Sequence, residues 1–245
     1  MKAWYEEWFN SDEYLSVYQH RDSAEADDFA KLICALIEVP LNCETLDLAC
    51  GAGRHSIAFA RQGHKVTGVD LSPLLIKTAR QQAAAENIAV DFLERNIIGL
   101  NLERKFNLVL NIFTSFGYFS EDADNFRIFE TAANHLQDSG IFVFDYFNSA
   151  VLEKSLVPYS RKILGLKIIE QIRSITNGFV SKKILIQSGS TIKMFSETVK
   201  LYPVKILVYQ LESAGFTIQQ LLAGYEGNPF DEETSPRFIA ICRKS

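Results

Sequence analysis

A glycine-containing turn is the part of the sequence whose residue types most clearly predict ligand chemistry. Residues 46–54 read LDLACGAGR and follow directly on a short apolar run. Glycines at such a turn lack Cβ atoms, so the backbone can approach a ligand closely and adopt unusual torsions. A helix that begins near Arg54 offers free backbone N–H groups to a polar or anionic ligand group. These features predict a ligand-binding turn between a strand and a helix.

A second acidic residue, Asp70, closes the next apolar run and lies 19 residues after Gly51. In doubly wound α/β folds an acid at about this distance accepts hydrogen bonds from ribose hydroxyls. A dinucleotide fingerprint would need a third glycine where Ser56 stands, and Asp47 would sit poorly beside a pyrophosphate. A cationic sulfonium with an ammonium group suits the turn better. The pattern therefore favours a nucleoside ligand of that kind.

The elements that position these residues alternate between strand and helix. Apolar runs predict strands at 45–49, 65–70, 90–94, 106–112 and 141–146, with helices at 23–38, 54–62, 72–87 and 121–137. Ser72 and Pro73 are typical of an N-cap followed by a first-turn proline. A helix at 203–214 and strands at 216–223 and 237–242, joined by a long acidic loop, complete the pattern. Such alternation predicts a mostly parallel sheet that is buried on both faces.

After residue 155 the pattern changes to alternating polar and apolar residues. Segments 162–175, 179–187 and 191–201 predict three antiparallel strands separated by hairpin signals. The predicted fold is α/β: a doubly wound, mostly parallel seven-stranded sheet of Rossmann-like type, with an antiparallel final strand and a small antiparallel β insertion. We divide the chain into an N-terminal lid and cofactor-binding core at 1–155, an insertion at 156–201 and a C-terminal completion of the core sheet at 202–245. The insertion is predicted to serve as a substrate cap or a dimer contact.

The glycine turn and residues 66–72, VTGVDLS, resemble the first two motifs of class I S-adenosylmethionine-dependent methyltransferases. The resemblance covers about residues 18–150 and is closest to small-molecule enzymes such as glycine N-methyltransferase and the amino-sugar N-methyltransferases. Several of these also carry an antiparallel insertion after the fifth strand. The resemblance implies S-adenosyl-L-methionine as cofactor, with the turn holding its methionine part and Asp70 its ribose. The implied cofactor-binding residues are Tyr18, Arg21, Asp47, Ala49, Gly51, Gly53, Asp70, Leu71, Asn96, Ile97 and Asn111.

Two of these positions carry more specific expectations. The family usually has an aspartate after the third strand at the adenine site, where this chain has Asn96. The Asn96 amide oxygen can still accept from the adenine amino group, although the charge is lost. An arginine ahead of the first long helix binds the cofactor carboxylate in glycine N-methyltransferase-like enzymes, so Arg21 is the candidate for this clamp. The alternative for Arg21 is a solvated side chain at a helix start.

Residues after the fourth and fifth strands are the candidates for acceptor binding. The aromatic loop at 114–119, TSFGYF, lies where ligands of open α/β sheets bind. It differs from the Asn/Asp-Pro-Pro-Tyr/Phe pattern of enzymes that methylate bases in DNA. Core packing would also explain Phe116 and Phe119. The predicted substrate-binding residues are Arg54, Ser115, Phe116, Tyr118 and Tyr146.

Three residues are candidates for a general base, namely His20, His55 and Asp145. A histidine with a pKa of about 6.5 can take a proton from an amine or hydroxyl acceptor. Methyl transfer is an in-line displacement, however, so positioning and desolvation can suffice without a base. A purely structural role for each histidine is the alternative.

The N-terminus is rich in aromatic side chains, namely Trp4, Tyr5, Trp8, Phe9, Tyr14 and Tyr18. We favour a lid that closes over cofactor and substrate, with the rings stabilising the sulfonium by cation–π attraction. The alternative is a staple that fixes the first long helix to the core.

Charge and composition argue against several classes of partner. The net charge is −5 and no segment is rich in lysine or arginine, so we expect neither nucleic acid nor an anionic membrane as partner. The N-terminus lacks the apolar run of a signal peptide, and no apolar stretch reaches the roughly 20 residues that span a bilayer. The cysteines Cys34, Cys43, Cys50 and Cys242 form no CxxC pair, which predicts reduced thiols, no metal site and a cytoplasmic protein.

The sequence therefore predicts a cytoplasmic methyltransferase that acts on nitrogen or oxygen of a small soluble molecule. Three alternatives stay open: a non-catalytic module that binds the same cofactor, a methyltransferase acting on protein or RNA, and a nicotinamide-dependent oxidoreductase. The acidic balance disfavours RNA, and Ser56 and Asp47 disfavour the oxidoreductase. The exposed strand edges of the insertion leave a homodimer open.

Overall fold

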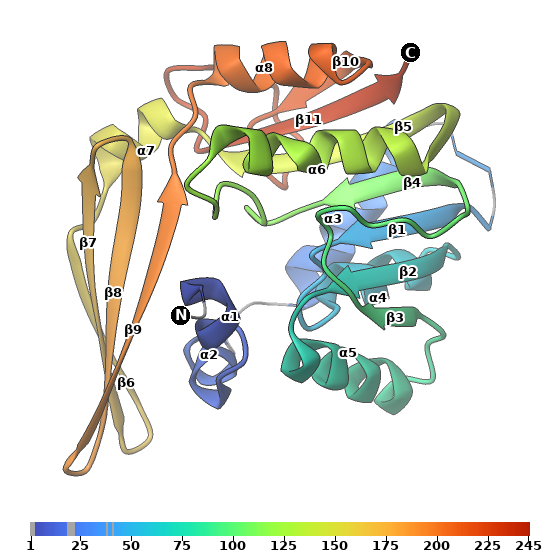
Figure 1. Ribbon diagram of the computed structural model, residues 1–245. Coiled ribbons are helices and arrows are strands. Elements are labelled where there is room, and N and C mark those ends of the chain that lie inside the picture. The colour runs from blue at the N-terminus through green and yellow to red at the C-terminus, as the bar shows by residue number, and fades with distance from the viewer. Residues whose placement is uncertain (1–2, 19–22, 38, 41) are drawn as a thin grey trace.

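The computed structural model describes residues 3–18, 23–37, 39–40 and 42–245, so His20 and Arg21 lie outside the described residues. The chain forms a seven-stranded sheet with helices on both faces and a separate four-stranded antiparallel sheet (Figure 1). The predicted fold class, a mostly parallel seven-stranded sheet with an antiparallel β insertion, is confirmed.

The order of strands in the large sheet is β10-β11-β5-β4-β1-β2-β3. Its strands are β1 (Glu44–Leu48), β2 (Lys65–Asp70), β3 (Asp91–Glu94), β4 (Phe106–Asn111), β5 (Leu136–Phe147), β10 (Phe216–Leu222) and β11 (Arg237–Lys244). Strand β11 is antiparallel to both of its neighbours, as predicted for the final strand. Because β1, β2 and β4 run parallel, their carboxyl ends meet at one edge of the sheet.

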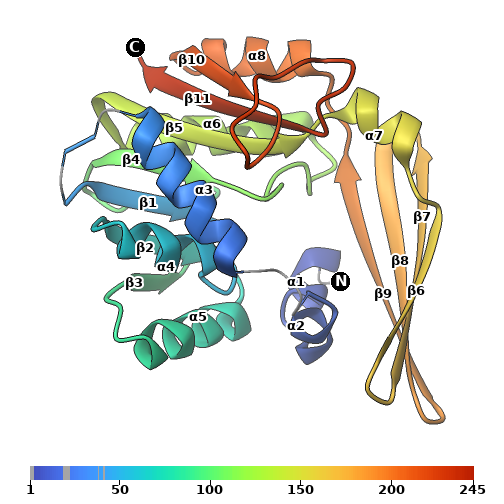
Figure 2. The same ribbon diagram turned by 180° about the vertical axis from the view of Figure 1, so that it is seen from behind.

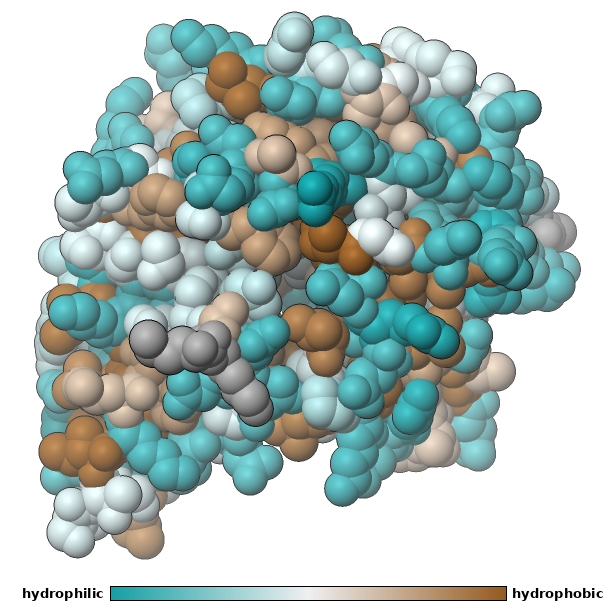
Figure 3. All heavy atoms as spheres, viewed as in Figure 1, coloured by the Kyte–Doolittle hydropathy of each residue, from teal (hydrophilic) through white to brown (hydrophobic). Residues whose placement is uncertain are grey.

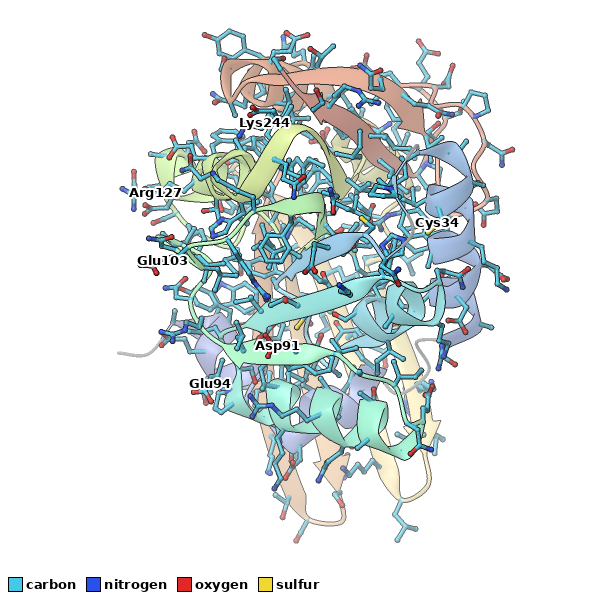
Figure 4. The ribbon with its side chains drawn as sticks, turned by 90° about the vertical axis from the view of Figure 1, so that its right-hand side faces the viewer. Cys34, Asp91, Glu94, Glu103, Arg127 and Lys244 are labelled. Carbon is cyan, nitrogen blue, oxygen red and sulfur yellow. The ribbon has the colours of Figure 1, made fainter. Side chains whose placement is uncertain are left out.

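Helices cover both faces of this sheet. Helices α3 (Ser23–Leu36) and α4 (Arg54–Arg61) cover one face, and α6 (Asp122–His135) and α8 (Val204–Ser213) cover the other, while α5 (Pro73–Ala85) packs against β2 and β3 (Figure 2). In the side view, Cys34 on α3 and Arg127 on α6 lie on opposite sides of the sheet (Figure 4). The Ser72 hydroxyl accepts the backbone N–H of Leu75 at 3.1 Å, which confirms the predicted N-cap of α5. None of the described helices is long and apolar enough to cross a membrane.

The junction between α6 and β5 differs from the expected boundaries. We expected the helix to reach 137 and the strand to begin at 141, but α6 ends at His135 and β5 begins at once with Leu136. Leu136 pairs with Phe106, and the register then shifts so that Ile141 pairs with Leu108. Leu136 is fully buried, so its burial beside β4 ends the helix earlier than the sequence pattern indicated.

The insertion contains four strands instead of the predicted three. They are β6 (Tyr159–Leu164), β7 (Lys167–Thr176), β8 (Phe179–Ser188) and β9 (Thr191–Lys200), preceded by the unpredicted helix α7 (Ser149–Ser155). A turn at Gly165 and Leu166 divides the segment that we expected to be one strand. Gly165 has a φ of 57°, whereas Leu166 is 92% exposed and reads like a strand residue in the sequence. Because an apolar residue occupies the tip of this turn, the sequence pattern did not indicate a hairpin here.

Two short helices, α1 (Trp4–Trp8) and α2 (Asp12–Tyr18), lie between the insertion and the core in both views (Figures 1 and 2). Trp8 and Val17 form a buried cluster with Ile169, Ile184 and Ile186 from the inner face of the insertion. The space-filling view shows apolar side chains near the centre of this face, between these helices and α6, and at the lower end of the insertion (Figure 3). The N-terminal helices are therefore held against the insertion by an apolar interface.

Candidate functional site

A cavity of about 840 Å³ opens at the carboxyl ends of β1, β2 and β4. Its walls come from the glycine turn, the end of β2, the loop after β4 and the N-terminal helices. The predicted site residues that line it are Tyr18, Asp47, Ala49, Gly51, Arg54, His55, Asp70, Leu71, Asn96, Ile97, Ser115, Phe116 and Tyr118. Gly53, Asn111, Asp145 and Tyr146 are not among the described lining residues.

The two glycines of the turn have different surroundings. Gly51 has a φ of 57°, and a Cβ built on it would meet nothing within 4 Å, so the backbone here is open to the cavity. Gly53 has a φ of 82°, and a Cβ there would lie 2.7 Å from the Phe92 ring and 2.9 Å from the Ala79 methyl group. We expected both glycines to serve the cofactor. Gly53 instead permits close packing of the turn against α5 and β3.

Asp70 closes β2 with both carboxylate oxygens oriented by the backbone. Its Oδ2 accepts the Gly51 N–H at 2.8 Å, and its Oδ1 accepts the Ser72 N–H at 2.9 Å. Burial raises the pKa of Asp70 above its ordinary value, although these backbone hydrogen bonds oppose the shift. Each carboxylate oxygen has a further lone pair, so Asp70 can accept from two neighbouring hydroxyl groups.

Asp47 lies at the end of β1 and is only 2% exposed. The Ser56 hydroxyl donates to its Oδ2 at 2.6 Å. Burial raises the pKa of Asp47 to about 7, with repulsion from Asp70 adding to the shift and Ser56 opposing it. Among the described residues, no lysine or arginine forms an ion pair with either acid. Two buried acids on one cavity wall favour a ligand with positive charge and hydroxyl groups.

Asn96 and Asn111 direct their side chains to the backbone. The Asn96 Oδ1 accepts the Ile98 N–H at 2.9 Å, which leaves one lone pair for a ligand amino group. The Asn111 Nδ2 donates to the Leu48 carbonyl at 3.0 Å, so this side chain braces the ends of β1 and β4. The fully buried Oδ1 of Asn111 has no hydrogen-bond partner among the described residues. Asn111 thus supports the cavity from behind, where we had expected a direct cofactor contact.

The opposite wall of the cavity is aromatic. Tyr118 packs against Trp4, Tyr5 and Phe9 of the N-terminal segment, with ring centroids 5.3, 6.3 and 5.7 Å away. The Tyr118 hydroxyl donates to the Thr114 carbonyl at 2.9 Å. This wall offers flat apolar surfaces and few charges, in contrast to the acidic wall.

The part of the chain that carries the acidic wall matches a known protein family. Residues 45–140 match a family model described as a methyltransferase domain. YqeM of Bacillus subtilis (strain 168), named as a methyltransferase, is 31% identical over 138 residues, which are 56% of this chain and 55% of that protein. The dTDP-3-amino-3,4,6-trideoxy-alpha-D-glucopyranose N,N-dimethyltransferase of Streptomyces venezuelae is 28% identical over 123 residues, 50% of this chain and 49% of that protein. The chain thus spans about half the length of these curated relatives.

Solved structures match nearly the whole chain in fold. An S-adenosylmethionine-dependent methyltransferase from Clostridium acetobutylicum ATCC 824 superposes with a TM-score of 0.82 at 20% identity, over 95% of this chain and 98% of that one. CalS10, an amino pentose methyltransferase from Micromonospora echinaspora with S-adenosylmethionine bound, gives 0.71 at 17% identity, over 96% and 98%. The fold match includes the insertion, and the family model covers the glycine turn and Asp70.

Residues 45–140 thus match a methyltransferase domain, and nearly the whole chain has the fold of S-adenosylmethionine-dependent methyltransferases.

Asp145 does not occupy the position that we expected of a general base. It is fully buried on β5 and accepts three hydrogen bonds: from the Phe113 N–H at 2.7 Å, the Tyr225 hydroxyl at 2.7 Å and the Arg237 Nε at 2.6 Å. A carboxylate engaged by three donors and absent from the cavity wall is poorly placed to take a proton from an acceptor. Its position fits a structural role behind the wall.

The loop that Asp145 holds is strained. Phe113 and Thr114 have φ values of 65° and 61°, which non-glycine residues rarely adopt. Besides Asp145, Arg237 supports this loop by donating from Nη2 to the Thr114 hydroxyl at 2.8 Å. Tyr225 and Arg237 were missed by sequence reasoning, because they lie in and beyond the long acidic loop with no motif around them. Strain of this kind is typical of functional sites.

Tyr146 and Phe116 are more deeply buried than a substrate contact requires. The Tyr146 hydroxyl donates to the Lys200 carbonyl and so ties β5 to the end of the insertion. Phe116 stacks on Phe129 with ring centroids 5.4 Å apart and also contacts Phe144, although it borders the cavity. Core packing, the alternative that we had kept for Phe116, therefore accounts for most of its contacts. Tyr146 supports the site from outside the cavity wall.

His55 and Arg54 border the cavity at the start of α4. The His55 ring is nearly buried and meets Phe29 and Tyr225 edge-on, with centroids 6.2 and 6.3 Å away. Arg54 forms an ion pair with Glu25, and its guanidinium lies 4.9 Å from the Phe113 ring. Both residues thus line the cavity, and their predicted roles, substrate binding for Arg54 and proton acceptance for His55, stay predictions.

The N-terminal helices contribute residues that the sequence did not mark. Glu6 and Asn10 line the cavity together with the expected aromatic residues. The Ser72 hydroxyl, two residues from Asp70, lies 2.7 Å from the Asn10 Oδ1 and 2.8 Å from the Phe9 carbonyl oxygen. The turn between α1 and α2 is therefore bonded to the strand end that carries Asp70.

Proposed function

We propose that this methyltransferase transfers the methyl group of S-adenosyl-L-methionine to a nitrogen or oxygen atom of a small soluble molecule. The observation that carries the proposal is the pair of buried acids, Asp47 and Asp70, beside the open backbone at Gly51. Relatives whose names specify an amino-sugar or an amino pentose as acceptor support a small-molecule substrate.

The residues present suit this cofactor. Asp70 has two oriented oxygens for the ribose hydroxyls, and the space at Gly51 admits a ligand close to the backbone. Asp47 supplies a buried negative charge for the ammonium or sulfonium group. Leu71, Asn96 and Ile97 border the same cavity and offer an apolar surface and an amide oxygen to the adenine.

The aromatic wall is our candidate for the acceptor side, and it favours an amine. Tyr5, Phe9, Tyr118 and Phe119 supply ring faces, which attract cationic or alkylated nitrogen groups. Glu6 borders the same part of the cavity, and burial together with the charges of Glu6 and Asp124 raises the pKa of Tyr5. A wall of aromatic rings bordered by the Glu6 carboxylate suits an amine better than an anionic hydroxy acid.

The bound cofactor supplies an electrophilic methyl group on a cationic sulfur. The chain's own residues have three tasks: Asp47 and Asp70 hold the cofactor, the aromatic wall orients the acceptor, and the N-terminal helices exclude water. Orientation of this kind can supply most of the rate of an in-line displacement. His55 is the candidate for accepting the proton that an amine loses, since its side chain borders the cavity.

Calorimetric titration of the purified protein tests the cofactor half of the proposal. We expect micromolar binding of S-adenosylmethionine and S-adenosylhomocysteine, and no binding of NAD. Binding of NAD alone, or of none of the three, would contradict the assignment.

An acceptor screen tests the second half. Small amines, amino sugars and hydroxy acids are incubated with the protein and S-adenosylmethionine, and formation of S-adenosylhomocysteine is measured. We expect turnover with an amine. Tight cofactor binding without turnover of any small molecule would favour a non-catalytic module, or an acceptor on protein or RNA.

We also propose that the protein works in the cytoplasm. Its four cysteines are free thiols in the structure, which suits a reducing compartment. A homodimer remains a prediction, which sedimentation at several protein concentrations would test.

A further inference from the structure

The insertion lies next to the cavity without lining it. We expected residues 156–201 to shape the acceptor site directly, but none of them is among the described residues of the cavity wall. Helices α1 and α2 and the turn between them lie between the insertion and the cavity, and they contribute Tyr5, Phe9, Asn10, Tyr14 and Tyr18 to the cavity wall. The insertion can therefore act on the cavity through these helices, and also through β9, whose Lys200 N–H donates at 2.8 Å to the carbonyl of Gly117 in the cavity wall.

A buried polar cluster joins the insertion to both N-terminal helices. The Oε1 of Glu197 on β9 accepts the indole N–H of Trp8 at 2.7 Å and also the hydroxyl of Tyr18. Lys182 on β8 donates to the Tyr18 oxygen at 2.6 Å and forms an ion pair with Glu197. One carboxylate thus binds α1 and α2 together.

Apolar contacts surround this cluster and shield it from water. The Trp8 ring packs on Phe195 with centroids 4.5 Å apart, and Ile169, Ile184 and Ile186 complete the buried interface. The side chains of Lys182 and Glu197 are only 21% and 16% exposed. Burial works against the charge of Glu197, but Lys182, Tyr18 and Trp8 overcome it and hold the pKa of this carboxyl below its ordinary value.

A largely buried carboxylate such as that of Glu197 is destabilising without its hydrogen-bond donors. The cluster therefore favours the arrangement of the helices that keeps these donors in place. If the helices moved away from the sheet, Glu197 would lose both the Trp8 and the Tyr18 hydrogen bonds. A purely apolar interface could slide, whereas two hydrogen bonds to one carboxylate oxygen fix the positions of both helices.

We propose that Glu197 is a positioning residue that holds the N-terminal helices over the cofactor cavity, so that the insertion sets how slowly the bound cofactor leaves. Glu197 acts through Trp8 and Tyr18, of which Tyr18 borders the cavity. The identity of the cofactor in this proposal rests on the proposed function. The inference that Glu197 fixes the helices rests only on the contacts described above.

The chain provides its own reporter for this proposal. It contains two tryptophans, Trp4 and Trp8, and both lie in α1, so intrinsic tryptophan emission reports on these helices. We compare the wild type with Glu197→Ala and Glu197→Gln by emission, by stopped-flow dissociation of S-adenosylhomocysteine and by calorimetry. The matched control is Lys193→Ala, which breaks the more exposed ion pair between Lys193 and Glu13 at the same interface.

For Glu197→Ala we expect red-shifted emission in the free protein and dissociation of S-adenosylhomocysteine at least fivefold faster than in the wild type. Glu197→Gln should be intermediate, because its amide oxygen still accepts from Trp8 and Tyr18. Lys193→Ala should stay within twofold of the wild type. This order of effects would distinguish a positioning role of Glu197 from a general loss of stability. Thermal unfolding of each variant measures the stability separately.

Wild-type emission together with a wild-type dissociation rate in Glu197→Ala would overturn the proposal. If Glu197→Ala does not fold, Tyr18→Phe takes its place, since it removes one hydroxyl and keeps the ring; unchanged emission and dissociation would then have the same meaning. If the wild type binds no adenosyl compound, the proposed function fails, yet the emission comparison still decides whether Glu197 holds the helices.

Discussion

The two walls of the cavity are built in different ways. The acidic wall comes from strand ends and one tight turn within residues 47–72, and its side chains are oriented by backbone groups a few residues away or on the adjacent strand. The aromatic wall combines the N-terminal helices with the loop after β4, and distant residues hold it: Arg237 supports Thr114, and Glu197 supports Trp8.

This difference indicates how the site divides its tasks. A wall fixed by strand ends and backbone hydrogen bonds is rigid before any ligand binds, which suits a cofactor that is the same in every turnover. A wall made of helices that pack on an insertion can vary in sequence and position without disturbing the sheet. We therefore expect cofactor affinity to depend on the first wall and acceptor choice on the second.

Replacement of Asp70 should have the largest effect on cofactor binding. Asp70→Ala should weaken binding of S-adenosylhomocysteine by about 100-fold or more, because hydrogen bonds to a charged group contribute about 1.5–3 kcal/mol each. Calorimetry measures the change. Asp91→Asn is the control, since Asp91 is exposed at the start of β3 and lies outside the cavity wall. A loss below tenfold in Asp70→Ala would place the ribose elsewhere.

The two glycines should separate folding from binding. Gly53→Ala should lower the free energy of unfolding by about 2–4 kcal/mol, because its methyl group would overlap Phe92 and Ala79 in a left-handed backbone. Gly51→Ala should cost about 1–2 kcal/mol for its backbone conformation alone, yet weaken cofactor binding more. Urea unfolding and calorimetry on both variants test this, and equal stability losses would contradict it.

Cofactor binding should depend on pH through Asp47. Its pKa of about 7 in the free protein means that the carboxyl is mostly protonated at pH 6 and mostly charged at pH 8. A cationic ligand binds the charged form, so affinity should rise about tenfold between these pH values, with release of a proton on binding. Calorimetry in buffers of different ionisation enthalpy measures both quantities. Asp47→Asn should bind more weakly and show a flat profile.

The same residue should lower the stability of the free protein. Since folding raises the pKa of Asp47, the charged carboxyl costs folding free energy that grows as pH rises from about 4 to about 7 and is constant above. Asp47→Asn should therefore unfold at a higher temperature than the wild type at pH 8, with a smaller difference near pH 5. A variant that is less stable at pH 8 would argue for a paired Asp47.

The smallest effect on the cofactor should come from the aromatic wall. Tyr118→Phe removes the hydroxyl bonded to the Thr114 carbonyl and keeps the ring contacts with Trp4 and Tyr5. We expect affinity for S-adenosylhomocysteine to change less than twofold. With an amine acceptor from the screen, KM should rise more than this. A cofactor effect as large as that of Asp70→Ala would remove the distinction between the two walls.

The predicted site residues differ in the same way between local and long-range contacts. Ala49, Gly51, Asp70 and Leu71, which we predicted to bind the cofactor, border the cavity because a contiguous turn and an adjacent strand end meet in any parallel sheet of this order. Asp145 and Tyr146 do not; they point to opposite faces of β5, where Arg237 of β11 engages Asp145 and the Lys200 carbonyl of the insertion engages Tyr146. Gly53 serves packing with Phe92 from β3, which no local pattern indicates.

By itself, the sequence determined the fold class and the strand that carries each acid, since apolar periodicity and the glycine turn are local properties of the chain. Only the tertiary structure decided which face of each strand meets the cavity, that the insertion has four strands and holds the N-terminal helices, and that Asp145 supports a strained loop. These features depend on contacts between residues far apart in the chain, such as Glu197 with Trp8 and Arg237 with Thr114. Such contacts produce no local pattern of residue types or spacing, so the sequence alone does not predict them.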